Sequence, residues 1–337
     1  MNDIADSMEA AAYAAKTVKA EVVPVSSKSR FAVKLKKISN ASIFESEGVI
    51  SSALGATLAE KRSISVVSGV NPLDLARAAS MRVPVVIINA SRTVGFQSMN
   101  SDSSDILLAR DSGAIIFLPE SNQEIIDNTI QAYRICEDNK VLLPAVINTD
   151  SPDSRDIIQI PSEQAVENML PKLRLPFRID VKKPVSFGLP LEDHSQQKMQ
   201  QAKAMENAVD VMTKTFEKWD EKFHRKYGFF ESYKTDDASY VFVAAGSNSR
   251  VVRIAVDLLR EKGEKVGMIR IRVLRPFVKD IVEALKGKSV AVIDSCGLLS
   301  DISSQITLIT SGKRLSEKDI TDLLPAMKKS ETGRFWL

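Results

Sequence analysis

Short apolar runs rich in β-branched residues alternate with amphipathic stretches through the first half of the chain. The runs predict buried strands at 64–67, 83–88, 114–117 and 142–147. The stretches between them predict helices at 72–80, 103–112 and 121–138. The last of these begins with Ser121 and carries Glu124 three residues later, which is the spacing of a capping box. Alternating strands and helices predict a parallel α/β sheet covered on both faces, with ligands at the carboxyl ends of the strands.

The second half repeats this alternation on a smaller scale. We expect strands at 240–245, 266–273 and 289–293, separated by a helix at 249–262 and by a second helix that ends at Leu285. This pattern predicts a small doubly wound α/β domain of about 90 residues. The tail adds an amphipathic helix at 316–328 and ends in Arg334-Phe335-Trp336-Leu337, which we expect to dock onto the protein.

The region between the two alternating parts has a different texture. Residues 150–190 carry six prolines and little periodicity, which predicts a linker or a wrapping segment. Apolar residues at spacings of three and four then predict one long helix at 194–226. A helix packed across a domain surface is favoured over a coiled-coil seam. We therefore divide the chain at 1–160, 161–235 and 236–337.

Composition narrows the class of protein. With 337 residues and 44% hydrophobic content, the chain can form roughly two domains with real cores. Its 46 basic and 43 acidic residues are interspersed, and aromatics make up only 6%, so no nucleic-acid surface stands out. No apolar run approaches the ~18 residues of a membrane span, and residues 1–20 lack the features of a signal peptide. We expect a soluble, cytoplasmic protein.

The two cysteines and two histidines restrict the metal chemistry. Cys136 and Cys296 lie far apart, which excludes a disulfide framework and a CxxC metal site and favours a reducing compartment. Two thiols cannot ligate an iron–sulfur cluster through four cysteines, so any such cluster belongs to a partner. Neither His194 nor His224 has a plausible Ser or Cys partner.

Nucleotide-binding motifs are missing from the sequence. Neither GxGxxG nor the P-loop pattern GxxxxGKS/T occurs, which argues against a dinucleotide site and a P-loop. The segment Gly246-Ser247-Asn248-Ser249 follows a predicted strand and could bind an anion at the start of the next helix. A plain turn between strand and helix is the favoured interpretation.

Two acids open a run of small residues near the N-terminal end. Residues 44–48, Phe-Glu-Ser-Glu-Gly, precede the small-residue stretch 49–59, in which another backbone or a flat ligand could come very close. Ser46 or Glu45 could cap the helix. Glu47 is then either a partly buried acid, which persists only if it is hydrogen-bonded or functional, or an ordinary first-turn acid favoured by the helix dipole.

Several segments, spread over almost the whole chain, resemble the alpha subunit of the 2-oxoacid:ferredoxin oxidoreductases both in sequence and in their order. The resemblance is to the pyruvate synthase type of these thiamine diphosphate enzymes, of which this chain would be a divergent member. The segments are Glu45-Ser46-Glu47 before the small residues, Asn122-Gln123-Glu124 with the helix that leads to Leu142-Leu143-Pro144, Pro184-Val185-Ser186-Phe187-Gly188, Ala204-Met205-Glu206-Asn207-Ala208, Lys226-Tyr227-Gly228, Gly246-Ser247 and Val273-Leu274-Arg275-Pro276-Phe277.

The resemblance implies an architecture. Residues 1–160 would form a pyrimidine-type thiamine-diphosphate-binding domain, and 161–235 a Pro-rich linker with a long packing helix. Residues 236–337 would form a transketolase-C-like α/β domain with a C-terminal tail. Both folded parts agree with the alternation described above.

The resemblance also implies site residues. The family's glutamate that hydrogen-bonds N1′ of the aminopyrimidine, and so favours the tautomer that deprotonates the thiazolium carbon, corresponds to Glu47 in its catalytic and cofactor-binding role. A shielded carboxyl group can share a proton with that nitrogen. The substrate-binding hydroxyl corresponds to Ser26, and the arginine that pairs with the substrate carboxylate corresponds most nearly to Arg92.

The implied reaction is oxidative decarboxylation of a 2-oxoacid, with acyl transfer to coenzyme A. Electrons would pass through 4Fe-4S clusters on partner subunits to ferredoxin. A beta subunit would hold the diphosphate and its Mg2+, so this chain would be active only with that subunit, and gamma and delta subunits would complete the complex. Neither nucleic acid nor membrane is expected as a partner.

Two departures from the family pattern keep other interpretations open. Residues 23–27 retain only the first proline and the hydroxyl of the family's turn, and 100–103 read Asn-Ser-Asp-Ser without the usual histidine. The alternative is a non-catalytic structural paralogue within a heteromeric complex. A weaker third hypothesis is a transketolase-C-like binding module with a ligand of its own.

Overall fold

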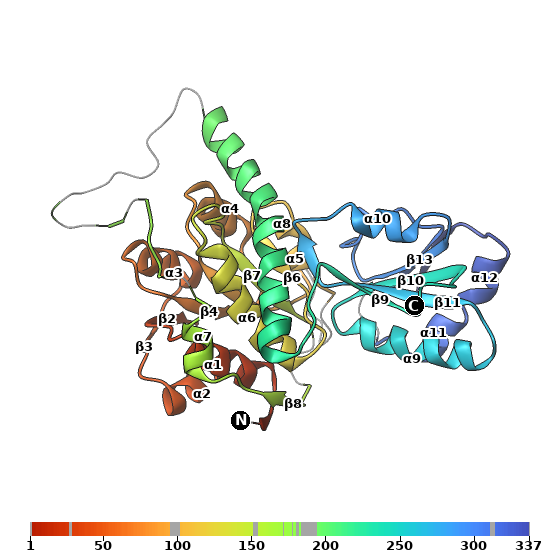
Figure 1. Ribbon diagram of the computed structural model, residues 1–337, viewed down its shortest axis with the longest axis horizontal. Coiled ribbons are helices and arrows are strands. Elements are labelled where there is room, and N and C mark those ends of the chain that lie inside the picture. The colour runs from red at the N-terminus through yellow and green to blue at the C-terminus, as the bar shows by residue number, and fades with distance from the viewer. Residues whose placement is uncertain are drawn as a thin grey trace.

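The chain forms two α/β parts that lie side by side, with one long helix running along the first (Figure 1). The computed structural model describes residues 2–26, 29–94, 102–150, 154–170, 172–176, 178–179, 182, 194–310 and 314–336. The long helix is α8 (Ser195–Phe223), close to the predicted 194–226. It ends where His224 adopts a left-handed conformation.

The first part is built on a parallel sheet. Its hydrogen-bonded strand order is β12-β6-β7-β5-β4, and β2, paired with β3, adjoins β4 through a bridge from Val22 to Ser63. The strands are β2 (Val22–Val25), β3 (Ser42–Glu45), β4 (Ile64–Val67), β5 (Val86–Ala90), β6 (Ile115–Phe117), β7 (Ala145–Thr149) and β12 (Val273–Arg275). All pairs are parallel except β12 with β6.

Side chains alternate between two cores along the central strands. Val86 and Ile88 of β5 enter one hydrophobic cluster, while Ile87 between them enters the other. Helices cover both faces, as the sequence predicts for a parallel sheet. The first cluster packs under α1 (Ser7–Thr17), α2 (Arg30–Ile38), α6 (Asn122–Cys136) and α8. The second packs under α3 (Val49–Leu58), α4 (Pro72–Ser80) and α5 (Ser104–Ala109).

The second part has a sheet of its own with strand order β15-β14-β13-β10-β11-β9. Only β9 runs antiparallel. The strands are β9 (Phe230–Tyr233), β10 (Tyr240–Ala245), β11 (Val266–Ile271), β13 (Ser289–Asp294), β14 (Ile306–Ile309) and β15 (Gly333–Trp336). The helices are α9 (Asn248–Glu261), α10 (Asp280–Leu285), α11 (Glu317–Thr321) and α12 (Leu324–Lys328). One face of this sheet shares the second cluster with the first part, so the two parts have a common core.

Four local predictions were wrong. The N-terminal stretch begins with β1 (Asn2–Ala5), which pairs antiparallel with β8 (Asp156–Gln159) inside the region predicted as a linker or a wrapping segment, where no strand was expected, and α7 (Glu163–Glu167) follows. The strand predicted at 266–273 is two strands, because the chain leaves one sheet after Ile271 and joins the other at Val273. The tail helix is divided into α11 and α12, with Pro325 near the start of the second. The terminus docks as expected, because β15 adds to β14.

The fourth wrong prediction is the capping box at the start of α6, which the Glu124 carboxylate does not complete. Ser121 accepts a hydrogen bond from the Glu124 N–H, but the Glu124 side chain accepts from the Glu120 N–H at 2.9 Å and from Arg270 of β11. A competing tertiary ion pair therefore decides the direction of this side chain.

A buried network of charges joins the two parts. Arg270 is fully buried and pairs with Glu120 at 3.0 Å, Glu231 at 3.2 Å and Glu124. Burial alone would raise the pKa of Glu231, but the hydrogen bond from Arg253 and the charge of Arg272 lower it to about 2. The network fixes β11 of the second sheet against α6 of the first part.

Candidate active site

The three site residues predicted from the sequence lie at one edge of the first sheet. Ser26 directly follows β2, Glu47 follows β3 by two residues, and Arg92 follows β5 by two residues. These strands are parallel, so their carboxyl ends meet at the same edge. Adjacent strands are about 4.8 Å apart, which puts the backbones of β2 and β5, with β4 between them, roughly 10 Å apart. We call this the carboxyl edge of the first sheet.

Ser26 and Glu47 belong to neighbouring strand ends. Val25 pairs with Glu45 in register, and the Ser46 N–H donates to the Val25 carbonyl at 2.9 Å. Both Ser26 and Glu47 are exposed. Neither forms a hydrogen bond or an ion pair with the residues that the structure describes.

In this chain Glu47 is neither the partly buried acid nor the first-turn acid that the sequence left as alternatives, because it is exposed and the first turn of α3 carries no acid. Helix α3 begins at Val49, its N-cap is Gly48, and no side chain caps it. Ser46 and Glu45 therefore do not cap the helix, and the Ser46 hydroxyl instead lies 2.8 Å from that of Ser52. Glu47 precedes the helix, at an edge where no described segment of this chain covers it.

Arg92 is exposed in the loop after β5, and among the described residues its guanidinium has no carboxylate partner. Below the loop lies a buried polar cluster that the sequence reasoning missed. Asn89 donates to Asp105 and to Asn148 at 2.7 Å each and accepts from the Gly69 N–H at 3.2 Å. It thereby links the ends of β4, β5 and β7 to the start of α5. A polar residue directly after each buried run, Asn89 after Ile88 and Asn148 after Ile147, was the available signal.

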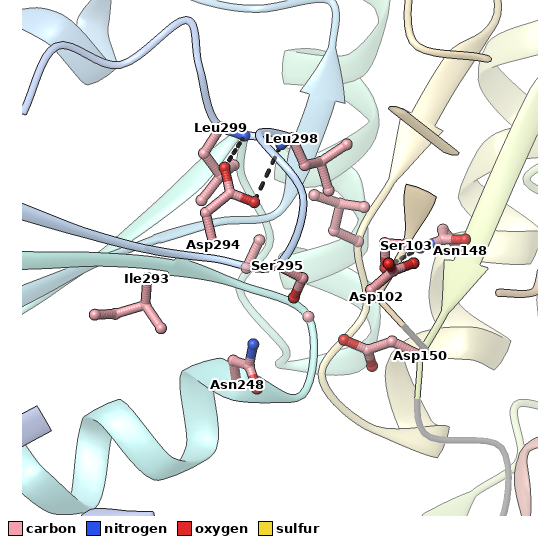
Figure 2. A pocket seen from close by; sticks show the side chains of 13 residues that line it. Asp102, Ser103, Asn148, Asp150, Asn248, Ile293, Asp294, Ser295, Leu298 and Leu299 are labelled. Atoms are coloured by element: carbon pink, nitrogen blue, oxygen red, sulfur yellow. Dashed lines mark hydrogen bonds between the residues drawn. The ribbon is translucent and has the colours of Figure 1, made fainter. Parts of the chain in front are cut away.

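The second sheet has its own crevice, between β10 and β13, where the strand order reverses. In doubly wound folds a ligand binds at this point. The lining includes Asn248, Asp294 and Ser295 from the second part and Asp102 and Asn148 from the first (Figure 2). Asp294 accepts hydrogen bonds from the Leu298 and Leu299 N–H groups and so closes the loop after β13. The free volume is about 20 Å³, which is roughly the space of one water molecule.

The carboxyl group of Asp150 lies near the start of α9. Both carboxylate oxygens of Asp150 accept from the Ser247 N–H, at 3.2 and 3.1 Å. Gly246 adopts a left-handed conformation with φ of 57°, and a Cβ atom there would collide with the Asp150 carboxylate. Burial raises the pKa of Asp150, against the opposing effect of the Ser247 hydrogen bonds. The predicted turn at 246–249 is therefore a turn between strand and helix whose Ser247 N–H is bound by a carboxyl group of the chain itself.

Within the described ranges, no helix combines the length and the apolar character needed to cross a membrane. Cys136 and Cys296 are free thiols. Burial raises the pKa of Cys136 well above its ordinary value and that of Cys296 to about 12.

Comparison with known families gives the same assignment for both parts of the chain. The model of the thiamine-diphosphate-binding domain of pyruvate flavodoxin/ferredoxin oxidoreductases matches residues 27–218, more than half of the chain. The chain belongs to this family. The model of core domain II of pyruvate:ferredoxin oxidoreductases matches residues 238–318. The protein is thus an alpha-type subunit of the 2-oxoacid:ferredoxin oxidoreductases.

Individual relatives agree. Pyruvate synthase subunit PorA of Thermotoga maritima is 37% identical over 265 residues, which are 74% of this chain and 67% of the relative. Ketoisovalerate oxidoreductase subunit VorA of Pyrococcus horikoshii is 32% identical over 229 residues, which are 64% of this chain and 57% of the relative. The alpha-type subunit therefore spans about two thirds or less of the length of these relatives.

Among solved structures, the 2-oxoglutarate:ferredoxin oxidoreductase of Magnetococcus marinus, with 2-oxoglutarate, coenzyme A and succinyl-CoA bound, matches with a TM-score of 0.73 at 17% identity. The match covers 97% of this chain and 65% of that one, and it shows a shared fold. The predicted family, the α/β fold and the oxidoreductase class of this alpha-type subunit are confirmed. The boundaries 1–160, 161–235 and 236–337 and the site residues Ser26, Glu47 and Arg92 stay predictions.

Proposed function

We propose that this alpha-type subunit contributes Glu47, Ser26 and Arg92 to a thiamine diphosphate site that a second subunit completes. The reaction is the oxidative decarboxylation of a 2-oxoacid, with acyl transfer to coenzyme A and electron transfer to ferredoxin. One observation carries the proposal. A carboxylate, a hydroxyl and a guanidinium gather at one sheet edge, and none of them has a partner among the described residues.

The residues fit the cofactor. When bound, thiamine diphosphate supplies a carbon nucleophile for the 2-oxo carbon. Glu47 stands before a helix that buries Val49 and Ile50 and leaves the small side chains of Ser51 and Ser52 toward the surface, so a flat ring can approach the backbone there. Its carboxyl group, which has no partner among the described residues, would hold a proton at N1′ of the aminopyrimidine ring.

Arg92 and Ser26 suit the substrate. The guanidinium of Arg92 can pair with the carboxylate of a 2-oxoacid through two parallel hydrogen bonds. The hydroxyl of Ser26 can donate to an oxygen of the same molecule. A planar guanidinium on a long side chain can extend over the strand that separates β5 from β2.

The remaining parts of the reaction belong to partners in this proposal. A beta subunit holds the diphosphate and Mg2+ and covers Glu47. Electrons pass to ferredoxin through 4Fe-4S clusters on partner subunits. Gamma and delta subunits complete the complex. Exposed apolar side chains close to the carboxyl edge support an interface there, since Phe44 is 42% and Leu73 67% exposed. Two free thiols support a reducing compartment such as the cytoplasm.

The test compares two neighbouring acids. In the complex purified with its partner subunits, Glu47→Gln should reduce 2-oxoacid-dependent reduction of a low-potential electron acceptor by at least about 100-fold, because the amide cannot exchange a proton with N1′. Glu45→Gln is the matched control, because Glu45 is also exposed but lies on β3, and it should keep nearly full activity. Full activity in Glu47→Gln would remove that residue from its role.

Two further measurements separate the alternatives. Pyruvate, 2-oxoisovalerate and 2-oxoglutarate, the 2-oxoacids that the names of the relatives suggest, should be assayed in parallel to identify the substrate. Mass spectrometry of the purified complex should find thiamine diphosphate. A complex without it, inactive on all three acids, would favour the non-catalytic structural paralogue.

A further inference from the structure

Directly below Arg92 lies a buried polar cluster to which the proposed chemistry gives no role. It consists of Asn89, Ser91, Asp105 and Asn148, each of which is at most 6% exposed. The four residues come from the ends of β5 and β7 and from the first turn of α5. We call them the Asn89–Asp105 cluster.

Asp105 is a buried acid held without a cation. Its Oδ1 atom accepts from the Ser91 hydroxyl at 2.6 Å and from the Ile106 N–H at 2.9 Å, and its Oδ2 atom accepts from Asn89 at 2.7 Å. No Lys, Arg or His among the described residues forms an ion pair with it. Burying a carboxylate is costly, and here hydrogen-bond donors alone compensate.

These bonds fix the loop that carries Arg92. Ser91 is held through its hydroxyl by Asp105 and through its N–H by the Thr149 carbonyl at 2.9 Å. On the other side of Arg92, the Val94 N–H donates to the Ser104 hydroxyl at 2.7 Å. Both side-chain anchors come from the first turn of α5, and Arg92 lies between them with its guanidinium exposed.

We propose that Asp105 is a positioning residue for substrate recognition. By holding Ser91 it sets the direction from which the Arg92 guanidinium meets the carboxylate of the 2-oxoacid. This inference rests on the proposed role of Arg92. Because the fold has already ordered the loop, substrate binding does not bear that entropy cost, and loss of the anchor weakens binding more than it slows the chemical step.

The central experiment is Asp105→Asn in the complex with its partner subunits, assayed with the best of the three 2-oxoacids. An amide at position 105 can accept on one side only. If it accepts from Ser91, its NH2 group faces the NH2 group of Asn89, and if it accepts from Asn89, its NH2 group faces the Ser91 hydroxyl and the Ile106 N–H, so the side chain no longer holds Ser91 and Asn89 together. We expect the KM for the 2-oxoacid to rise about tenfold while kcat stays within about twofold.

A swapped pair tests the geometry. In the double variant Asn89→Asp and Asp105→Asn, the amide at 105 donates to the carboxylate at 89, and the Asn148 amide can turn over to donate as well. The KM should return to within about threefold of the native value. If Asp105→Asn does not assemble, Ser91→Ala removes one hydrogen bond only and should raise the KM about threefold.

Two controls make the outcome decisive. Glu137, at the end of α6 and away from the carboxyl edge, forms another buried bidentate pair, with Arg62. Glu137→Gln weakens this pair and should lower the stability of the protein without changing the KM. Arg92→Ala should raise the KM at least as much as Asp105→Asn. A variant that combines Arg92→Ala with Asp105→Asn should raise the KM no further than Arg92→Ala alone.

An unchanged KM in Arg92→Ala would refute the role of Arg92. If the KM rises in Arg92→Ala but is unchanged in both Asp105→Asn and Ser91→Ala, the positioning role of Asp105 is overturned and the role of Arg92 stands. The positioning role is also overturned if Glu137→Gln raises the KM as much as Asp105→Asn does.

Discussion

The carboxyl ends of the strands meet in the same way in the two sheets, but the polar groups there differ in whether they are paired within the chain. In the second sheet, the crevice between β10 and β13 is filled from within, because Asp150 of the first part lies against Gly246 and Ser247. At the carboxyl edge of the first sheet, Glu47 and Arg92 are exposed and have no described partner. Among the described residues, Asp150 is thus paired inside the chain at the second crevice, whereas Glu47 and Arg92 at the first edge are left for the proposed ligands. This difference argues against the hypothesis of a binding module with a ligand in the second part.

The largest expected effect comes from breaking the buried charge network that joins the two parts of the chain. Arg270→Ala should lower the free energy of unfolding by about 3–5 kcal/mol, because the buried Glu124 carboxylate loses its fully buried partner and keeps only Arg272 at 3.7 Å. Denaturant unfolding of the purified chain measures this loss. Arg334→Ala, at an exposed position of β15, should change it by less than about 0.5 kcal/mol. Equal effects of the two substitutions would contradict the bridging role of Arg270.

A smaller effect should follow from forcing Asp150 out of the filled crevice. Gly246→Ala introduces a Cβ atom that collides with the Asp150 carboxylate, and we expect a loss of about 2–3 kcal/mol from the collision and the left-handed backbone together. Gly263→Ala is the matched control, since Gly263 is also left-handed but has no neighbour near its Cβ position. It should cost only about 1 kcal/mol, measured by the same unfolding experiment. If both alanine variants lose the same amount, Asp150 is not held where the structure has it.

The smallest effect is a pH dependence. The pKa of Asp150 is raised in the folded protein, so its contribution to stability is fully present below the unfolded pKa, which is near 4, and is lost as pH rises through the folded pKa. Asp150→Asn removes this titration. The free energy of unfolding of the native protein, relative to the variant, should therefore fall between pH 4 and pH 7. A difference that stays constant or rises over this range would mean that burial does not govern this carboxyl group.

Much of the fold followed from periodicity in the sequence. Strand β10 lies at the predicted residues 240–245 and helix α4 at the predicted 72–80, because clear hydrophobic runs and an Asn cap specify them locally. The strand predicted at 266–273 failed for a different reason. Val273 is as apolar as Ile271, and only the position of β6 in space makes it part of another sheet. The β1–β8 pair was missed because its two strands lie about 150 residues apart in sequence.

The sequence by itself determined the family and the α/β class, and it predicted the residue types of a 2-oxoacid site. Those depend on composition, periodicity and ordered motifs, which a linear chain carries in full. Only the tertiary structure decided which polar groups are satisfied. It paired Asp150 with the start of α9, buried Asp105 behind Arg92, and left Glu47 exposed at the carboxyl edge of the first sheet. Whether a carboxylate is paired or free depends on groups brought together from distant parts of the chain, and local sequence does not encode those distances.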